Sequence, residues 1–342
     1  LGWFRWPLGL MLGGVTAMGL IRPLAVAFST RHQARNLEPR IVLIIIVVAI
    51  CWSALGGAGH FFFANYDWDI RDAVLRDLVV SPWPPAYGQS GHGDIILRAP
   101  VAYYLPAAFF GWALGLQFAD LALWFWTALG TGLFLALLPL PNTLSFRLFA
   151  SLSLVILFSG MDVLGWLSVM QSLPKLGEHI EWWALLFQYS SNTTQLFWVP
   201  NHALPAWIAI IIFFRHWKHH EFYNFVPYTL ALLPLWSPFA AIGIAPFYLA
   251  WMLSYHQQIK WAPSVWGPAI GLLAFTVPYL TLGLSSISTH APAALDDLSP
   301  FAFISLGILF VLYEFLFLWI LLLRREDRLL LAVTGAILFI LP

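Results

Sequence analysis

Residues 41–63 read IVLIIIVVAICWSALGGAGHFFF, an apolar run without Asp, Glu, Lys or Arg. A helix needs about 20 such residues to cross the roughly 30 Å of hydrocarbon in a bilayer. Runs of similar length recur along the chain, whereas a membrane barrel would show short alternating segments. Because only helices and closed barrels satisfy their backbone groups in lipid, the sequence predicts an all-α, polytopic transmembrane helical bundle.

The composition of the whole chain agrees with this fold class. Hydrophobic residues make up 61% of the 342 residues and charged residues 9%, against roughly 25% charged residues in soluble domains. Sixteen basic residues balance sixteen acidic ones, so net charge indicates no nucleic acid partner. The single cysteine, Cys51, excludes an intrachain disulfide and a cysteine-based zinc site. Membrane lipids are therefore the expected surroundings.

We expect about ten spanning segments in a single transmembrane domain over residues 1–342. They are placed at 7–28, 41–63, 121–140, 148–166, 203–214, 225–236, 239–254, 264–283, 300–323 and 329–342. The chain starts at Leu1 and stops at Pro342 inside an apolar run, so we expect both termini to be cut.

The distribution of charge sets the orientation. If residues 101–118 lie in the membrane plane or re-enter, ten basic residues collect on one side, in loops 29–40, 141–147, 215–224, 255–261 and 324–328. The positive-inside rule makes that side cytoplasmic. Eleven acidic residues then fall on the other side, mostly in two long polar loops, 64–100 and 167–202. We expect an integral protein of the bacterial inner membrane, with its functional face toward the periplasm or exterior.

The first outer loop contains an amphipathic pattern over residues 65–78. Ile70, Val74, Leu75 and Leu78 repeat at helical spacing, which predicts an interfacial helix with an i,i+4 pair between Asp72 and Arg76. Asp67 precedes this helix at the membrane boundary, where a partly desolvated carboxylate can act as a base toward an acceptor hydroxyl or amine. The alternative is that Asp67 caps the helix and the other carboxylates form a solvated face.

These residues resemble the first-loop signature of the GT-C superfamily, the integral membrane glycosyltransferases that depend on polyprenyl-phosphate sugars. The stretches Ser81-Pro82-Trp83-Pro84-Pro85-Ala86-Tyr87, Tyr103-Tyr104-Leu105-Pro106-Ala107-Ala108 and Phe118-Ala119-Asp120-Leu121 are similar to bacterial members of this type. The resemblance covers roughly residues 41–320 and implies a second in-plane helix in this loop. It also implies a polyprenyl-phosphate-sugar donor, a glycan, lipid or protein acceptor, and an inverting transfer. Asp67-Trp68-Asp69 stands where many members have Asp-Glu, so the catalytic base is Asp67 or Asp69.

The second outer loop supplies groups of the kinds that hold sugars and phosphates. Aromatic faces stack on sugars, and amides, imidazoles and guanidinium groups donate to phosphate oxygens. With two arginines of the first loop, the expected substrate-binding residues are Asp162, Glu178, His179, Glu181, Tyr189, Asn192, Asn201, His202, Arg71 and Arg98. Asp162 equally well caps its helix or pairs with an arginine, and intramembrane Glu314 is expected to pair with a polar group.

No cofactor is expected from the sequence. Glu178, His179 and Glu181 with His202 follow no recognised zinc spacing, although some members of the superfamily use a divalent cation. No nucleotide-binding motif is present, so the donor must be lipid-linked. Two other classes stay open: a lipid or sugar transporter, in which Asp162 or Glu314 relays protons, and a non-catalytic scaffold for envelope assembly.

Overall fold

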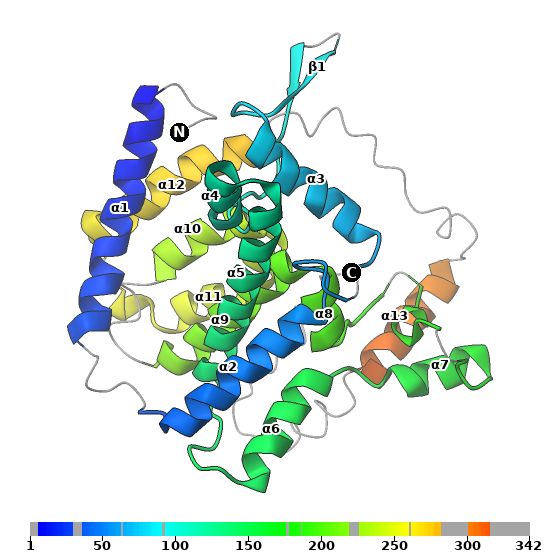
Figure 1. Ribbon diagram of the computed structural model, residues 1–342. Coiled ribbons are helices and arrows are strands. Elements are labelled where there is room, and N and C mark those ends of the chain that lie inside the picture. Colours follow the sequence, from blue (N-terminus) through cyan, green and yellow to red (C-terminus); the bar gives the residue numbers. More distant parts are fainter. Residues whose placement is uncertain are drawn as a thin grey trace. The chain divides into compact units, whose positions relative to one another are not determined.

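The computed structural model describes residues 6–29, 36–62, 64–90, 93–175, 178–185, 187–218, 226–259, 261–281 and 300–314 (Figure 1). Within these ranges the chain is mostly helical. The first five α-helices are α1 (Trp6–Ser29), α2 (Pro39–Ala54), α3 (Asp67–Val80), α4 (Leu105–Leu114) and α5 (Leu116–Leu137). They are followed by α6 (Phe146–Leu157), α7 (Asp162–Met170), α8 (Asn192–Trp198), α9 (Pro200–His216), α10 (Val226–Trp236), α11 (Pro238–Ser254), α12 (Pro263–Thr281) and α13 (Pro300–Glu314).

The remaining elements in these ranges are small. Two 3-10 turns lie at η2 (Ile180–Trp182) and η4 (His256–Gln258). Strands β1 (Ala86–Ser90) and β2 (Gly93–Ile96) pair antiparallel as a hairpin, with Ala86 opposite Ile96 and Ser90 opposite Gly93. This hairpin follows α3 in the first outer loop, a feature that the helical expectation did not include.

The chain divides into two compact units. The first contains residues 1–151 and 196–282, and the second contains residues 152–195 and 283–342. This division does not test the single transmembrane domain expected from the sequence, which stays a prediction.

Helix α5 is the central helix of the first unit, where it packs against α2, α4 and α9 (Figure 1). Its polar side chains form hydrogen bonds at these interfaces. Ser53 of α2 donates to Thr131 Oγ1 at 3.2 Å, and the Tyr103 hydroxyl lies 2.6 Å from Thr127 Oγ1. Hydrogen bonds between helices satisfy hydroxyl groups that have no water to bind. Around this centre, α3 packs on α4, α11 packs on α9, and α12 packs on α1 and α10.

Two described helices, α5 and α12, are long and apolar enough to cross a membrane. Helices α6 and α7 would supply a third span if they are counted together, although they are bent by 41° at their junction. Most of the other apolar helices are shorter; α4, for example, rises only about 15 Å over its ten residues. The structure thus shows a mostly helical chain in which two described helices are candidates for membrane spans. The number of about ten spans is not confirmed, and the segment at 329–342 lies outside the described residues.

Two expected segments differ from the helices observed. The segment 41–63 is helical only to Ala54, because Gly56, Gly57 and Gly59 follow in turns and bends. Gly57 lies so close to the Trp68 ring that an added Cβ would overlap it. The segment 148–166 is interrupted, since the chain leaves the helix at residues 158–161, so α6 and α7 together form at most one broken span.

The break after α6 is stabilised by hydrogen bonds from the start of α8. Asn192 Nδ2 donates to the carbonyl of Val155 at 2.8 Å, and Thr193 Oγ1 donates to the carbonyl of Ile156 at 2.6 Å. The backbone N–H of Asn192 reaches the carbonyl of Phe158 at 3.0 Å. A helix end in apolar surroundings requires such partners for its free carbonyls, so these contacts explain why the interruption is tolerated.

The predicted amphipathic helix is present as α3, but its buried side differs from the expectation. Trp68, Leu75 and Leu78 are buried, whereas Ile70 is 71% exposed. Arg71 and Asp72 lie next to the buried stripe rather than on a solvated face. Helix α3 therefore turns Arg71 and Asp72 toward neighbouring parts of the first unit.

Candidate functional site

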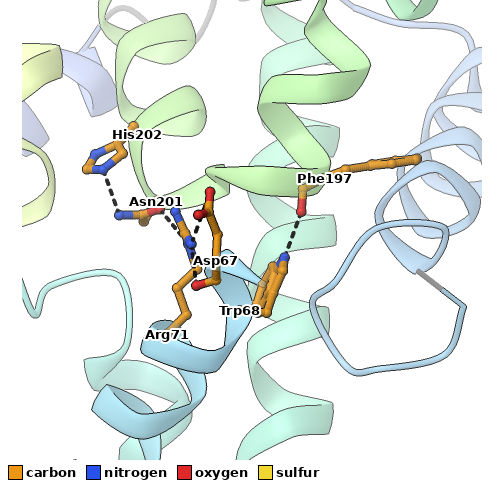
Figure 2. Close-up of polar contacts among 6 residues, drawn as sticks. All are labelled: Asp67, Trp68, Arg71, Phe197, Asn201 and His202. Atoms are coloured by element: carbon orange, nitrogen blue, oxygen red, sulfur yellow. Dashed lines mark hydrogen bonds and ion pairs between the residues drawn. The ribbon is translucent and has the colours of Figure 1, made fainter. Parts of the chain in front are cut away.

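The first cluster of polar side chains lies where α3 meets the start of α9. Figure 2 shows Arg71 between Asp67, one turn earlier on α3, and Asn201 of α9. Arg71 Nη1 donates to the backbone carbonyl of Asp67 at 2.7 Å and lies 3.9 Å from the Asp67 carboxylate. Arg71 Nε donates to Asn201 Oδ1 at 3.3 Å. The Arg71 side chain is only 11% exposed, so these contacts compensate a charge that is largely removed from water.

The network continues from Asn201 through His202 to Ser237. Asn201 Nδ2 lies 3.3 Å from His202 Nε2, and His202 Nδ1 lies 2.8 Å from Ser237 Oγ. Because Asn201 Oδ1 accepts from Arg71, its Nδ2 must donate, and His202 Nε2 must therefore be the acceptor. The histidine proton is then on Nδ1 and is donated to Ser237. This inferred polarity requires a neutral imidazole.

The electrostatics agree with a neutral His202, which lies just before the expected spanning segment 203–214. Burial, and to a lesser extent the positive charge of Arg71, lower the pKa of His202 to about 4. Ser237 is the N-cap of α11, where its Oγ also accepts from the backbone N–H of Ala240 at 3.0 Å. The network thus links the ends of three helices, α3, α9 and α11.

Trp68 holds α3 in this position. Its ring is 1% exposed and packs on Gly57, and its Nε1 donates to the carbonyl of Phe197 at 2.7 Å, as Figure 2 shows. The Arg71 guanidinium also lies 5.9 Å from the centre of this ring. Trp68 therefore anchors α3 to Gly57 and to Phe197, near the end of α8.

The two expected bases have different surroundings. Asp67 is the first residue of α3 and its side chain is 30% exposed, within reach of both Arg71 and solvent. Asp69 is exposed on α3, and its side chain has no hydrogen bond or ion pair among the described residues. The capping alternative for Asp67 is wrong, since Tyr66 occupies the N-cap and no side chain caps the helix.

A second acidic group on α3 faces a histidine that was not singled out from the sequence. Asp72 Oδ1 lies 3.2 Å from His60 Nε2, whereas Arg76, its expected i,i+4 partner, is exposed. Burial raises the pKa of Asp72, and His60 opposes that shift. Asp72 thus pairs with His60, which precedes α3 in the chain, and not with Arg76 as expected.

The other expected site residues occupy the second unit, apart from Arg98, which is exposed after β2. Glu178 is exposed and accepts from the backbone N–H of Lys175 at 2.6 Å. His179 stacks on Trp182 with ring centres 4.6 Å apart. Both residues are positioned by local contacts within the loop.

The remaining loop residues are engaged by the fold of the second unit. Buried Glu181 accepts from the Ser191 backbone at 3.1 Å and from Thr194 Oγ1 at 2.8 Å. Tyr189 is half-buried with its ring edge toward Phe158, and the Asn192 amide caps the end of α6 as described above. No group of three or more His, Cys, Asp or Glu in the described ranges is arranged to hold a metal ion.

The expected residues therefore separate into two groups, one in each unit. Asp67, Arg71, Asn201 and His202 are joined by contacts in the first unit, and Asp162, Glu178, His179, Glu181, Tyr189 and Asn192 belong to the second. Sequence reasoning missed Ser237, Trp68 and His60 as members of the first group. Ser237 carried a readable signal, because serine directly before Pro238 is typical of a helix N-terminus.

Comparison of the chain with protein-family models, with curated proteins and with solved structures gives no match. The likeness to the GT-C superfamily thus rests on the residues quoted in the sequence analysis alone.

Proposed function

We propose that this protein is an integral membrane glycosyltransferase of the GT-C type. It transfers a sugar from a polyprenyl-phosphate-linked donor to a glycan, lipid or protein acceptor on the non-cytoplasmic side of a bacterial inner membrane. The observation that carries the proposal is the arrangement at the start of α3. There a partly exposed carboxylate, Asp67, lies beside the largely buried cation Arg71, at the start of the first helix after the apolar helix α2.

In this proposal Asp67 is the general base. Its carboxylate accepts the proton of the acceptor hydroxyl or amine as the acceptor atom forms its bond to the anomeric carbon of the donor. The bond from that carbon to the phosphate oxygen breaks, and the electron pair leaves with the polyprenyl phosphate. Attack opposite to the leaving group inverts the anomeric centre.

Arg71 is the group best suited to the donor phosphate. A guanidinium has five N–H donors, of which the hydrogen bonds among the described residues use two. The remaining donors can bind phosphate oxygens and stabilise the charge that develops on the leaving group. Asn201 positions the guanidinium through its contact with Nε, and His202 and Ser237 position Asn201 in turn.

The test is sugar transfer by purified protein in lipid nanodiscs, with labelled polyprenyl-phosphate hexoses and an extract of envelope acceptors. Asp67→Asn removes the proton acceptor but keeps the shape of the side chain, so transfer should fall by about 100-fold or more. Asp69→Asn is the matched control, since it makes the same change two residues away on the same helix, and it should transfer normally. Normal transfer by Asp67→Asn would refute the assignment of the base.

A different result would refute the reaction class itself and not only the assignment of the base. If the wild-type protein transfers no sugar from any polyprenyl-phosphate donor but moves a lipid or sugar across proteoliposome membranes, the transporter class is correct. Arg71→Lys separates donor binding from base catalysis, because lysine keeps the charge but loses the planar set of donors. We expect this variant to raise the KM for the donor more than it lowers kcat.

A further inference from the structure

The second unit contains two buried carboxyl groups that the proposed sugar transfer does not use. Asp162 begins α7 and is 3% exposed, and Glu314 at the end of the described part of α13 is 0% exposed. Helices α7 and α13 pack against each other. The ion pairs found among the described residues include neither carboxyl, so no basic side chain compensates them there.

Each carboxyl group has one oxygen with a donor and one without. Ser159 Oγ donates to Asp162 Oδ2 at 2.6 Å, and Trp183 Nε1 donates to Glu314 Oε1 at 2.6 Å. The other two oxygens, Asp162 Oδ1 and Glu314 Oε2, are buried and receive no donor in the described part of the chain. The two side chains are nevertheless within hydrogen-bonding reach of each other. A hydrogen bond between two carboxyl groups requires that one of them carries a proton, because an ionised carboxylate only accepts.

We propose that Asp162 and Glu314 form a proton-binding site, in which one proton is shared between the two carboxyl groups. Two carboxylates held together away from water cannot both stay ionised, because each charge loses its hydration and repels the other. One added proton converts the repulsion into a hydrogen bond from one carboxyl to the other. The ligand of this site is therefore a proton, and the site is independent of the proposed glycosyltransferase activity.

The groups that face the pair favour retention of the proton. Glu181 accepts from three donors, Ser191, Thr194 and Gln188, and its negative charge acts on Asp162. The Tyr189 phenol is the other titratable group that interacts with both members of the pair. A nearby negative charge, with no positive charge beside the pair among the residues that the structure describes, makes a second ionisation in the pair unfavourable.

The surroundings of the pair are tightly packed, so loss of the proton would affect the fold. Glu314 lies against Gly160, where an added Cβ would overlap its carboxylate. Trp183 is fully buried against Gly165 and Phe310 and holds the second oxygen of Glu314. Deprotonation would leave two charges in this space, and their repulsion would separate the start of α7 from α13.

The test is infrared spectroscopy of the purified protein at pH 7, with the C=O stretch of protonated carboxylic acids as the probe and deuterium exchange for its assignment. The wild-type spectrum should contain a protonated-acid band at a pH where ordinary Asp and Glu are ionised. Asp162→Asn and Glu314→Gln should each abolish the band that belongs to the pair, since an amide then donates to the remaining carboxylate. Glu178→Gln, an exposed carboxylate of the same unit, should leave the band unchanged.

A wild-type protein without any protonated-acid band at pH 7 would overturn the proposal even if neither variant folds. So would a band that survives intact in both Asp162→Asn and Glu314→Gln, because another carboxyl would then carry the proton. Titration with NaCl or CaCl2 at constant pH is a third test. Loss of the band on addition of either salt would show that the pair binds a metal cation in place of the proton.

Discussion

Replacing Trp68 with alanine is expected to release α3 from the first unit. Truncation of a buried Trp to Ala typically costs about 3–5 kcal/mol, and removal of the indole N–H also leaves the Phe197 carbonyl without its donor. We therefore expect the free energy of unfolding to fall by about 4 kcal/mol, which is roughly a thousandfold in the unfolding equilibrium. Sugar transfer should be lost as well, because α3 carries Asp67 and Arg71.

The measurement is denaturant unfolding of the detergent-solubilised protein, with limited proteolysis to report on α3. Trp68→Phe keeps a buried ring but loses the N–H donor, so it should cost only about 1–2 kcal/mol. Trp112→Ala is the matched control, since Trp112 of α4 is 76% exposed and its truncation should change stability by no more than about 0.5 kcal/mol. If Trp68→Ala unfolds at the same denaturant concentration as Trp112→Ala, Trp68 does not hold α3 in place.

Three further perturbations test neighbouring parts of the first unit. Gly57→Ala should destabilise the protein by about 1–3 kcal/mol in the same unfolding assay, because the added Cβ overlaps the Trp68 ring; Gly132→Ala, which meets only an ordinary contact, should not. Ser237→Ala should cost about 1 kcal/mol through loss of the α11 cap and should raise the donor KM. Because the pKa of His202 is lowered to about 4, its contribution to stability is fully present above pH 6.5 and is lost as pH falls toward 4. His202→Gln should flatten that acid-side decrease in melting temperature.

The sequence by itself determined the helical class of this protein and the approximate positions of its apolar segments. Helix α10 at Val226–Trp236 and helix α11 at Pro238–Ser254 begin and end within a residue of the predicted segments at 225–236 and 239–254. These features depend on local chemistry, namely the length of apolar runs and the places where proline and polar residues interrupt them. The same local chemistry identified the start of α3 and its two acidic residues, Asp67 and Asp69.

Only the tertiary structure decided which side of each helix meets protein. In a chain of apolar residues, lipid is as good a solvent for leucine or isoleucine as another helix is, so the hydrophobic pattern does not distinguish the two sides. For this reason the sequence placed Ile70 on the apolar face of an interfacial helix without showing what that face meets, and the structure exposes Ile70 and buries Trp68. The same limit applied to the break before α7, which depends on hydrogen bonds from Asn192 and Thr193, 37 residues away from their acceptors.

The polar contacts of both sites could not be predicted from the sequence for the same reason. Arg71 meets Asn201 across 130 positions of sequence, and Trp183 meets Glu314 across 131. The sequence identified each of these residues except Trp183 as costly to bury or suited to bind substrate, since that follows from side-chain chemistry alone. Their partners depend on which helices pack together, and that is decided by the shapes of contacts such as Gly57 against Trp68 and Gly160 against Glu314.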